Sequence, residues 1–445
     1  MVDRRTFLTT SVAGLAFLGL QRAGLAASLE PLAGTPPFAP LAPDPARHFD
    51  LAGGFSYRII ARSGQTMTDG WRLPGDPDGM AAFAGRHGRV ILVCNHELDL
   101  DEFAAGPFAD HPALVENLGA KTLFDRGYEH PCPGGTTTHQ YNPEDGRIER
   151  SFLSLAGTER NCAGGPTPWG SWLSCEETCV RAGTRYRRDH GWVFEVPATA
   201  KTLVEPVALT AMGRFNHEAC AVDPATGIVY MTEDQSDGLF YRYMPERPGH
   251  LAAGGRLQAL TFRDPGSADT RNWSQPTLAE HRPRIVDWID LDDAESPNDD
   301  LRQRGHAAGA ALFARGEGLW WGNGEVYLAA TTGGPDRLGQ IFRLIPGFGG
   351  DRLELFYESR HPRLMKHCDN LTVTPWGDLL VCEDRDESAS LLGVTPRGRV
   401  YEFARNVGSQ SELAGVCFAP DGRTLFVNLQ DDGLMLAITG PFPSA

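Results

Sequence analysis

The sequence predicts an all-β protein built from repeated hairpins. Glycine and proline are abundant, with 51 and 32 residues among 445, as expected for a chain with many tight turns. Short apolar runs alternate with turn signals such as Asn323-Gly324 and Asp421-Gly422. The same hairpin spacing also recurs along the chain. A repeated β unit that cannot bury its apolar face alone must pack against neighbouring copies.

The clearest hairpin runs from Cys162 to Glu177, with its turn at Trp169-Gly170. These ends stand 15 positions apart around the turn, so antiparallel pairing would place them opposite each other at the hairpin mouth. Four copies share this spacing and a fifth is longer: Glu218–Glu233, Glu317–Thr332, Asp369–Asp384, Gly415–Gln430 and Asp78–Glu97. Six hairpins predict a six-bladed β-propeller as the simplest closed arrangement.

The other segments fit around these hairpins. Residues 28–50, rich in proline and alanine, predict an extended arm, and residues 55–61 predict the first strand. Insertions are expected at residues 98–135 and 264–312, the second partly helical around residues 307–313. The remaining ranges predict further strands: 139–155, 190–212, 238–262, 340–345, 353–358 and 398–403.

The N-terminal segment 1–27 predicts a twin-arginine signal peptide. Arg4 and Arg5 precede an apolar run at residues 11–20 and a stretch of small residues. The alternative is a frayed cytosolic tail. Cleavage would leave residues 28–445, which contain neither a linker nor a further transmembrane run, as one domain in the periplasm.

The formal net charge of −16 argues against a nucleic acid or an anionic membrane as the partner. The same charge suits cation binding, because bound metal ions offset clustered carboxylates. The nine cysteines are an odd count for an exported chain, and their spacing does not determine any disulfide.

The mouths of the hairpins carry mostly acids. The first positions are Cys162, Glu218, Glu317, Asp369 and Gly415; the second are Glu177, Glu233, Thr332, Asp384 and Gln430; Glu97 ends the longer copy. In a propeller the innermost strands would gather these side chains at the central channel, where such a concentration of negative charge requires cations. Oxygen ligands suit calcium, and a thiolate among them admits iron or zinc. The alternative for any single acid is a solvated residue at a strand end.

Cationic and titratable residues stand beside these acids. Arg315 lies two residues before Glu317, so it shares one strand face with that acid and is a natural phosphate binder. The alternative is a salt bridge that only neutralises a carboxylate. Three histidines adjoin mouth residues, as ligands, general acids or structural hydrogen-bonding groups: His96, His217 and His367. Lys366 and Arg214 are candidates to add positive potential.

Several stretches resemble the signature of the PhoX-type alkaline phosphatase family. The most specific is Asn161-Cys-Ala-Gly-Gly-Pro-Thr-Pro-Trp-Gly-Ser-Trp-Leu-Ser-Cys-Glu-Glu177. Others are Phe215–Glu218, Arg315–Gly318, Asp369–Leu371 and Leu425–Gln430. The chain is shorter than well-known members, as in a compact branch of the family. The twin-arginine leader is also typical of it.

The resemblance implies a six-bladed propeller with an iron–calcium cluster (Fe³⁺ and Ca²⁺) in its channel. It implies that Cys162 ligates iron, that Glu177, Glu218 and Glu317 bridge metals, and that Arg315 binds phosphate. The further expected ligands are Glu97, Glu233, Asp369 and Asp384, with His217 and His367 as substrate-binding residues. The expected activity is phosphomonoester hydrolysis, by a monomer acting on small phosphate esters without stable membrane insertion.

Two alternatives remain open from the sequence. One is a calcium-dependent propeller lactonase or esterase, which needs oxygen ligands but no thiolate. The other is a non-catalytic propeller whose metal cluster is structural only. Motifs of other hydrolases are absent: there is no Gly-rich phosphate loop, no nucleophile elbow and no HExxH sequence.

Overall fold

Antiparallel strands dominate the structure, a computed structural model that describes residues 38–264, 268–385 and 387–443. The predicted signal peptide, residues 1–27, lies outside the described residues. The chain divides into two units, Met1–Phe38 and Ala39–Ala445, and every described strand belongs to the second unit. Among the described residues, no helix has both the length and the apolar character needed to cross a membrane.

The strands form five sheets. The first contains β4 (Pro77–Ala84), β5 (Val90–His96), β6 (Gly134–Asn142) and β7 (Arg147–Thr158); the second contains β8 (Asn161–Pro166), β9 (Ser171–Glu176) and β10 (Val193–Pro197). The third contains β11 (His217–Val222), β12 (Val229–Glu233), β13 (Phe240–Pro245), β14 (Gly255–Phe262), β15 (Arg284–Leu291), β16 (Gly316–Gly322), β17 (Glu325–Ala330), β18 (Gln340–Ile345) and β19 (Arg352–Glu358). The fourth contains β20 (Cys368–Val373), β21 (Leu379–Glu383), β22 (Ser390–Val394), β23 (Val400–Asn406), β2 (Phe49–Ala52) and β1 (Leu41–Ala42). The fifth contains β24 (Leu413–Phe418), β25 (Thr424–Leu429), β26 (Leu434–Thr439) and β3 (Ser56–Arg62).

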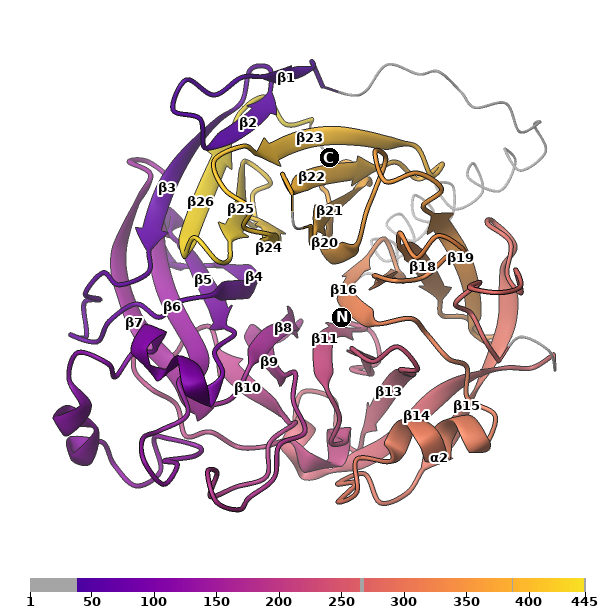
Figure 1. Cartoon of the computed structure of the whole chain (residues 1–445), viewed down its shortest axis with the longest axis horizontal. Coiled ribbons are helices and arrows are strands. Elements are labelled where there is room, and N and C mark those ends of the chain that lie inside the picture. Colours follow the sequence, from indigo (N-terminus) through magenta and orange to yellow (C-terminus); the bar gives the residue numbers. More distant parts are fainter. Residues whose placement is uncertain (1–37, 265–267, 386, 444–445) are drawn as a thin grey trace, which may run out of the picture. The chain divides into compact units, whose positions relative to one another are not determined.

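The first strand of every predicted hairpin lies at the centre of the arrangement (Figure 1). Around this centre, β4, β8, β11, β16, β20 and β24 contact one another in that order, and β24 contacts β4 again. Glycine permits their close approach, since a Cβ on Gly79 would lie 2.5 Å from Cα of Ala163 and one on Gly318 would lie 2.6 Å from the carbonyl oxygen of Asp369. The result is an all-β, propeller-like ring of radially arranged strands.

The two ends of the described chain meet in one sheet. β3 pairs with β26, with Tyr57 opposite Ile438. β2 pairs with β23 in the neighbouring sheet, with Phe49 opposite Asn406. The ring is thus closed by main-chain hydrogen bonds between its earliest and latest strands.

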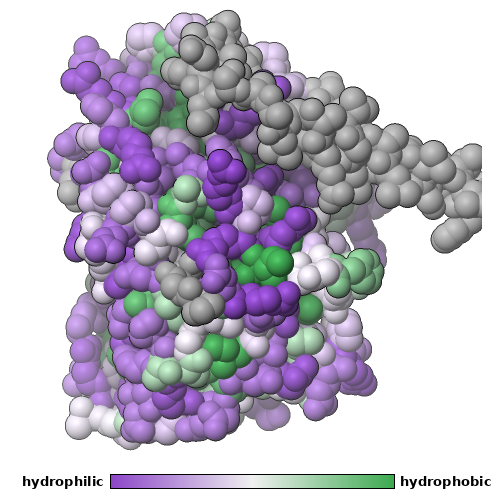
Figure 2. Space-filling model, turned by 90° about the vertical axis from the view of Figure 1, so that its right-hand side faces the viewer, coloured by the Kyte–Doolittle hydropathy of each residue, from purple (hydrophilic) through white to green (hydrophobic). Residues whose placement is uncertain are grey.

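Apolar side chains pack between adjacent sheets and between the two halves of the nine-stranded third sheet. One cluster joins Phe240 of β13 and Leu260 of β14 to Leu328 of β17 and Phe342 of β18. Another joins Val93 and Leu155 of the first sheet to Trp172 and Phe194 of the second. The alternate residues of each strand therefore face a neighbouring sheet, and the packing holds the innermost strands in place. The side face in Figure 2 is mostly hydrophilic, with hydrophobic residues in small separate patches.

The two predicted insertions fold differently. In the range 98–135, residues 98–133 contain only short 3₁₀ turns, η2 (Leu100–Ala105) and η3 (Pro112–Asn117), and β6 begins at Gly134. Residues 264–312 contain a full strand, β15, which pairs with β14 over six residues and with β19 over two. The helix in this segment, α2, spans Leu301–Ala307, so the expected helix at residues 307–313 is wrong. Residues 310–313 instead extend toward neighbouring strands, and Phe313 N–H donates to the carbonyl of Gly238.

The other short 3₁₀ turns are η1 (Arg86–Gly88), η4 (Thr210–Met212) and η5 (Leu251–Ala253). The arm predicted at residues 28–50 includes the start of β2, because alternating Phe49 and Leu51 are buried and can join a sheet edge.

Candidate metal centre

The innermost strand of each hairpin carries a β-bulge at the same place. In every case two residues lie opposite one residue of the partner strand, and the first of the two is Asp78, Cys162, Glu218, Glu317, Asp369 or Gly415. A bulge bends a strand and redirects a side chain. The repeat detected in the sequence is thus a repeated backbone distortion that points one residue per hairpin toward the channel.

Five of these bulge residues and two neighbouring acids, seven side chains in all, form one cluster. Three overlapping groups each have ligand atoms within 4.8 Å of one another: Asp78, Glu97 and Cys162; Cys162, Glu177 and Glu218; Glu218, Glu317 and Asp369. Cys162 and Glu218 belong to two groups each and connect the set. The structure therefore brings together six of the eight predicted ligands: Glu97, Cys162, Glu177, Glu218, Glu317 and Asp369. We call these six residues together with Asp78 the channel cluster.

The channel cluster has the properties of a cation site. Glu218 is completely buried, and neither of its carboxylate oxygens has a hydrogen-bond partner. Oδ1 of Asp78 is also buried and unpartnered. Burial, followed by repulsion from neighbouring acids, raises the pKa of Asp78, Glu218 and Glu317 well above its ordinary value. Unpaired buried acceptors are costly, and bound cations would satisfy them, so the residues fit a cluster of metal ions.

Cys162 gives this cluster its mixed donor chemistry. Its thiol is 8% exposed, and Sγ lies 3.0 Å from Oδ2 of Asp78. Burial and the charge of Asp78 raise the pKa of this thiol well above its ordinary value, so a cation is needed to hold it as a thiolate. Carboxylates suit calcium and a thiolate suits iron or zinc, so this donor set can hold more than one kind of ion.

The predicted pairing of Cys162 opposite Glu177 is wrong in register. Asn161 pairs with Glu176, and Cys162 lies in the unpaired bulge. The side chains of Cys162 and Glu177 still meet in the channel cluster. The bulge redirects the side chain of Cys162, and Glu177 directly follows Glu176, the last paired residue of its strand. Glu177 is held by a hydrogen bond from its N–H to the carbonyl of Arg160.

That last contact also recurs. The N–H of a residue at the end of the second strand donates to the carbonyl of the residue two before the bulge: Glu97 to Asp76, Glu177 to Arg160, Asp234 to Asn216, Thr331 to Arg315 and Asp384 to His367. The structure thus places Asp234 where the 15-residue spacing placed Glu233. The turn of β11–β12 is one residue longer, since Asp223 N–H bonds to Ile228 whereas Thr167 N–H bonds to Ser171.

Glu233 itself is turned away from the channel cluster. Its Oε2 accepts hydrogen bonds from the hydroxyl of Tyr241 at 2.7 Å and from Leu239 N–H at 3.1 Å. Arg302 lies 3.6 Å from its other oxygen. Asp234 instead faces the channel, where it binds Arg315 through two bonds of 2.8 Å. Glu233 is therefore part of the surrounding structure rather than a member of the channel cluster.

Two arginines stand at the rim of the channel cluster. Arg315 donates to Asp234 and, at 2.8 Å, to Glu317. Arg160 donates from a single nitrogen to Glu97 at 2.8 Å and to Glu177 at 2.7 Å. Both side chains are about one third exposed, at 35% and 36%. Each guanidinium thus combines a fixed position beside the acids with access to solvent.

The histidines differ in environment. His217 is completely buried, bonds the carbonyl of Gly213 at 2.9 Å and stacks on Phe215. Burial lowers its pKa to about 3, so it is a neutral core residue that the structure does not bring to the channel cluster. His96 is likewise buried between Gly75 and Thr137. His367 is only half-buried, and the charges of Asp384 and Arg315 act on it, so it borders the rim.

Other predicted residues separate in the same way. Asp384 borders the channel cluster, where its charge raises the pKa of Asp369 after the larger effect of burial. Arg214 is buried and donates to backbone carbonyls, including those of His190 and Ser296, so it adds no charge to the channel. Each of the nine cysteines is a free thiol, and all except Cys179 are buried.

Four residues near the channel were not predicted as site residues: Asp78, Arg160, Asp234 and Glu412. Arg160 could have been found, because it precedes Cys162 by two positions as Arg315 precedes Glu317. Asp234 is hidden by the longer turn. Glu412 has a pKa raised to about 10 by burial and by the nearby charges of Asp369 and Asp384. No spacing rule points to Glu412, since it lies outside the repeated positions.

Comparison with solved structures agrees with this fold. The solved structure of Pseudomonas fluorescens PhoX in complex with vanadate, a transition state analogue, matches with a TM-score of 0.67 and 19% identity over 91% of this chain and 97% of that one. A gluconolactonase from Xanthomonas campestris matches with a TM-score of only 0.42 and 12% identity over 92% of this chain and 99% of that one. Among curated protein sequences, none matches this chain.

The family description "Alkaline phosphatase PhoX" matches residues 36–147 and 143–433. The match covers almost all of the described chain, including every residue of the channel cluster. The chain therefore belongs to the PhoX alkaline phosphatase family.

Proposed function

We propose that the protein is a metal-dependent phosphomonoesterase whose channel cluster holds iron and calcium ions. The observation that carries this proposal is a mostly buried set of one thiol and six carboxylates with a partly exposed arginine at its rim. Membership of an alkaline phosphatase family supports the reaction class. The vanadate complex of Pseudomonas fluorescens PhoX supports a phosphoryl site in this fold.

In this proposal the channel cluster divides by donor type. Cys162 would ligate iron, since iron accepts a thiolate and calcium prefers oxygen. Glu177, Glu218 and Glu317 would bridge ions, and Glu97, Asp78 and Asp369 would complete the set. When bound, the ions supply Lewis acidity and positive charge for the phosphoryl group.

The chain's own contribution is to hold and orient the substrate. Arg315 is fixed by two bonds to Asp234, which leaves its contact with Glu317 free to exchange for a phosphoryl oxygen. A guanidinium fixed in this way is preorganised for the negative charge that develops on those oxygens. His367 at the rim is a candidate for a hydrogen bond to the leaving group, because burial lowers its pKa and favours the neutral ring.

Elemental analysis and turnover of p-nitrophenyl phosphate test this function together. We expect iron and calcium to copurify with the protein, and phosphate release to stop when a chelator removes them and to return when they are restored. Calcium without iron, with no phosphate release but with hydrolysis of a sugar lactone, would favour the lactonase alternative. Metal without any turnover would favour the non-catalytic alternative.

We also propose the finer architecture and location. The nine-stranded sheet counts as two blades, since β15 and β19 share only two paired residues, and this division gives six blades in a single domain spanning residues 28–445. Arg4 and Arg5 support twin-arginine export to the periplasm. The small, separate hydrophobic patches in Figure 2 support a monomer.

A further inference from the structure

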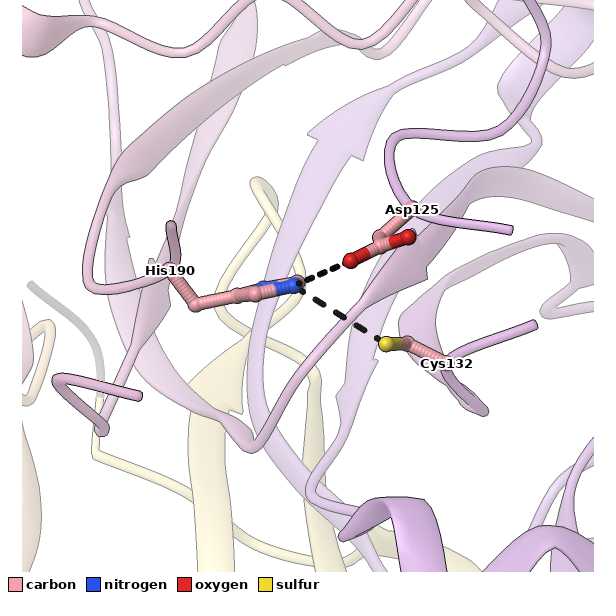
Figure 3. A group of neighbouring side chains, drawn as sticks. All are labelled: Asp125, Cys132 and His190. Carbon is pink, nitrogen blue, oxygen red and sulfur yellow. Dashed lines mark hydrogen bonds and ion pairs between the residues drawn. The ribbon is translucent and has the colours of Figure 1, made fainter. Parts of the chain in front are cut away.

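A second cluster of metal-ligating side chains lies outside the channel. Asp125, Cys132 and His190 are buried, and each offers a ligand atom within 4.8 Å of the other two. Figure 3 shows the carboxylate of Asp125 and the sulfur of Cys132 pointing toward the same nitrogen of His190. Cys132 lies between Pro131 and Pro133, so its backbone has little freedom to turn the thiol away.

The ring of His190 is oriented by a carboxylate on its other side. Nδ1 lies 2.6 Å from Oε1 of Glu176, and Nε2 lies 3.3 Å from Oδ2 of Asp125 and 3.9 Å from Sγ of Cys132. Glu176 is itself fixed, because Oε2 accepts N–H bonds from Gly191 and Trp192. In metal sites, a histidine commonly donates one ring N–H to a carboxylate, which orients the ring, while its other nitrogen binds the metal. His190 shows this arrangement, with Glu176 at Nδ1 and with Asp125 and Cys132 facing Nε2.

The spacing of the donors suits a small tetrahedral ion. Zinc bonds nitrogen and oxygen at about 2.0–2.1 Å and sulfur at about 2.3 Å, so tetrahedral donors stand roughly 3.3–3.7 Å apart. The observed separations of 3.3 Å and 3.9 Å from Nε2 are close to these values. Calcium is disfavoured, because it takes oxygen ligands in larger numbers.

A further buried acid, Glu159, lies near this cluster. Glu159 is buried, and its Oε1 accepts from the hydroxyl of Tyr186, whose ring packs edge-on against His190 with centroids 5.4 Å apart. Its other oxygen, Oε2, is buried without a hydrogen-bond partner. Glu159 thus adds a buried, unpaired carboxylate oxygen near Cys132 and His190, and a cation held by the cluster would offset its charge.

We propose that Asp125, Cys132 and His190 form a structural zinc site. The ion would join segment 118–133, which contains no strand, to His190 just before β10 and, through the contact of His190 with Glu176, to the end of β9. Glu176 is adjacent to Glu177, and successive residues of an extended chain face opposite ways, so this site would stand directly behind a member of the channel cluster. Its role would be to hold that strand end in position.

The test uses Cys162→Ser protein, which lacks the thiol of the channel cluster. Any sulfur–metal signal in this protein is then expected from Cys132. In Cys162→Ser protein we expect about one zinc per chain by elemental analysis, with sulfur in the zinc coordination shell by X-ray absorption. Replacing zinc by cobalt should give a thiolate-to-cobalt absorption band. Adding Cys132→Ser should remove both the sulfur signal and the bound zinc, whereas adding Cys417→Ser, a change in the apolar core, should remove neither.

The measurement on Cys162→Ser protein alone decides the proposal even if the double variant does not fold. Absence of sulfur from the zinc shell, or absence of zinc, would overturn it and leave His190 as a charged ring held between Asp125 and Glu176. Neither result depends on phosphatase turnover, so this site can fail while the proposed function stands, and the reverse also holds.

Discussion

Arg160 and Arg315 occupy equivalent positions in two different hairpins. Each lies two residues before the bulge residue of its innermost strand, Cys162 or Glu317, and each has a left-handed backbone, with φ of 46° and 55°. Each also bonds two carboxylates at the channel. Left-handed backbone at a residue other than glycine is costly and tends to persist where function requires it. The ring thus presents two guanidinium groups at the rim of the channel cluster.

Replacing Arg315 by alanine should lower kcat/KM for p-nitrophenyl phosphate by about 100- to 1,000-fold, the usual effect of losing one charge-stabilising donor. Arg160→Ala should lower it in the same direction. Arg263→Ala is the matched control, since its ion pair with Asp287 is exposed and Arg263 is not part of the channel cluster. Full activity of both rim variants would contradict a phosphate-binding role for these arginines.

Cys162→Ser should remove iron selectively. A serine hydroxyl is a poorer ligand for iron than a thiolate, while calcium bound by the surrounding carboxylates should be retained. We expect loss of thiolate-to-iron visible absorption, loss of iron in elemental analysis and loss of phosphatase activity together. Retention of iron and activity in this variant would show that the thiol is not a ligand.

The metal-free protein should become less stable as pH rises. Burial and neighbouring charges raise the pKa of Asp369 from 3.8 to about 7 and that of Glu412 from 4.5 to about 10. The folded state therefore binds more protons than the unfolded state, so stability is greatest below about pH 4 and falls as pH rises toward these folded values. Thermal unfolding of chelated protein across this range should show the fall, and metal-loaded protein should resist it. An apo protein whose Tm rises with pH would contradict the buried cluster.

Gly79→Ala should destabilise the ring and weaken metal binding. A Cβ at this position would lie 2.5 Å from Cα of Ala163, so β4 and β8 would have to separate. We expect a cost of about 1–3 kcal/mol, as for other overpacked sites, together with a lower metal content. Gly349→Ala is the control, because no atom lies within 4 Å of an added Cβ there. Equal stability of the two variants would show that the innermost strands tolerate wider spacing.

Much of the channel cluster could be predicted because one backbone distortion recurs in every hairpin. Constant spacing identified Cys162, Glu218, Glu317 and Asp369, which all occupy the same bulge position. The method failed where turn length changed: the extra residue between Asp223 and Ile228 moved Asp234, rather than Glu233, to the channel. A fixed residue spacing assumes turns of equal length. What recurs in the structure is the hydrogen bond from the residue that ends the second strand to the residue two before the bulge.

The direction of a side chain was harder to predict than its neighbourhood. His217 precedes Glu218 in the sequence, yet it stacks on Phe215 in the core while Glu218 enters the channel. Glu412 reaches the rim of the channel from outside the repeat and left no periodic signal. The second cluster combines Asp125, Cys132 and His190 from loops whose contacts depend on the completed fold.

The pairing of β3 with β26 determines when the channel can exist during synthesis. Ser56 and Thr439, which lie opposite each other in this pair, are 383 positions apart. A ribosome-bound chain that has produced every acid of the channel cluster still lacks β26, the strand that pairs with the early strand β3. Contacts at such separation form late, because a long loop must close before they are gained. Assembly of the complete channel cluster is therefore a post-translational event, and a chain shortened before Leu434 would carry its acids without the enclosure that gathers them.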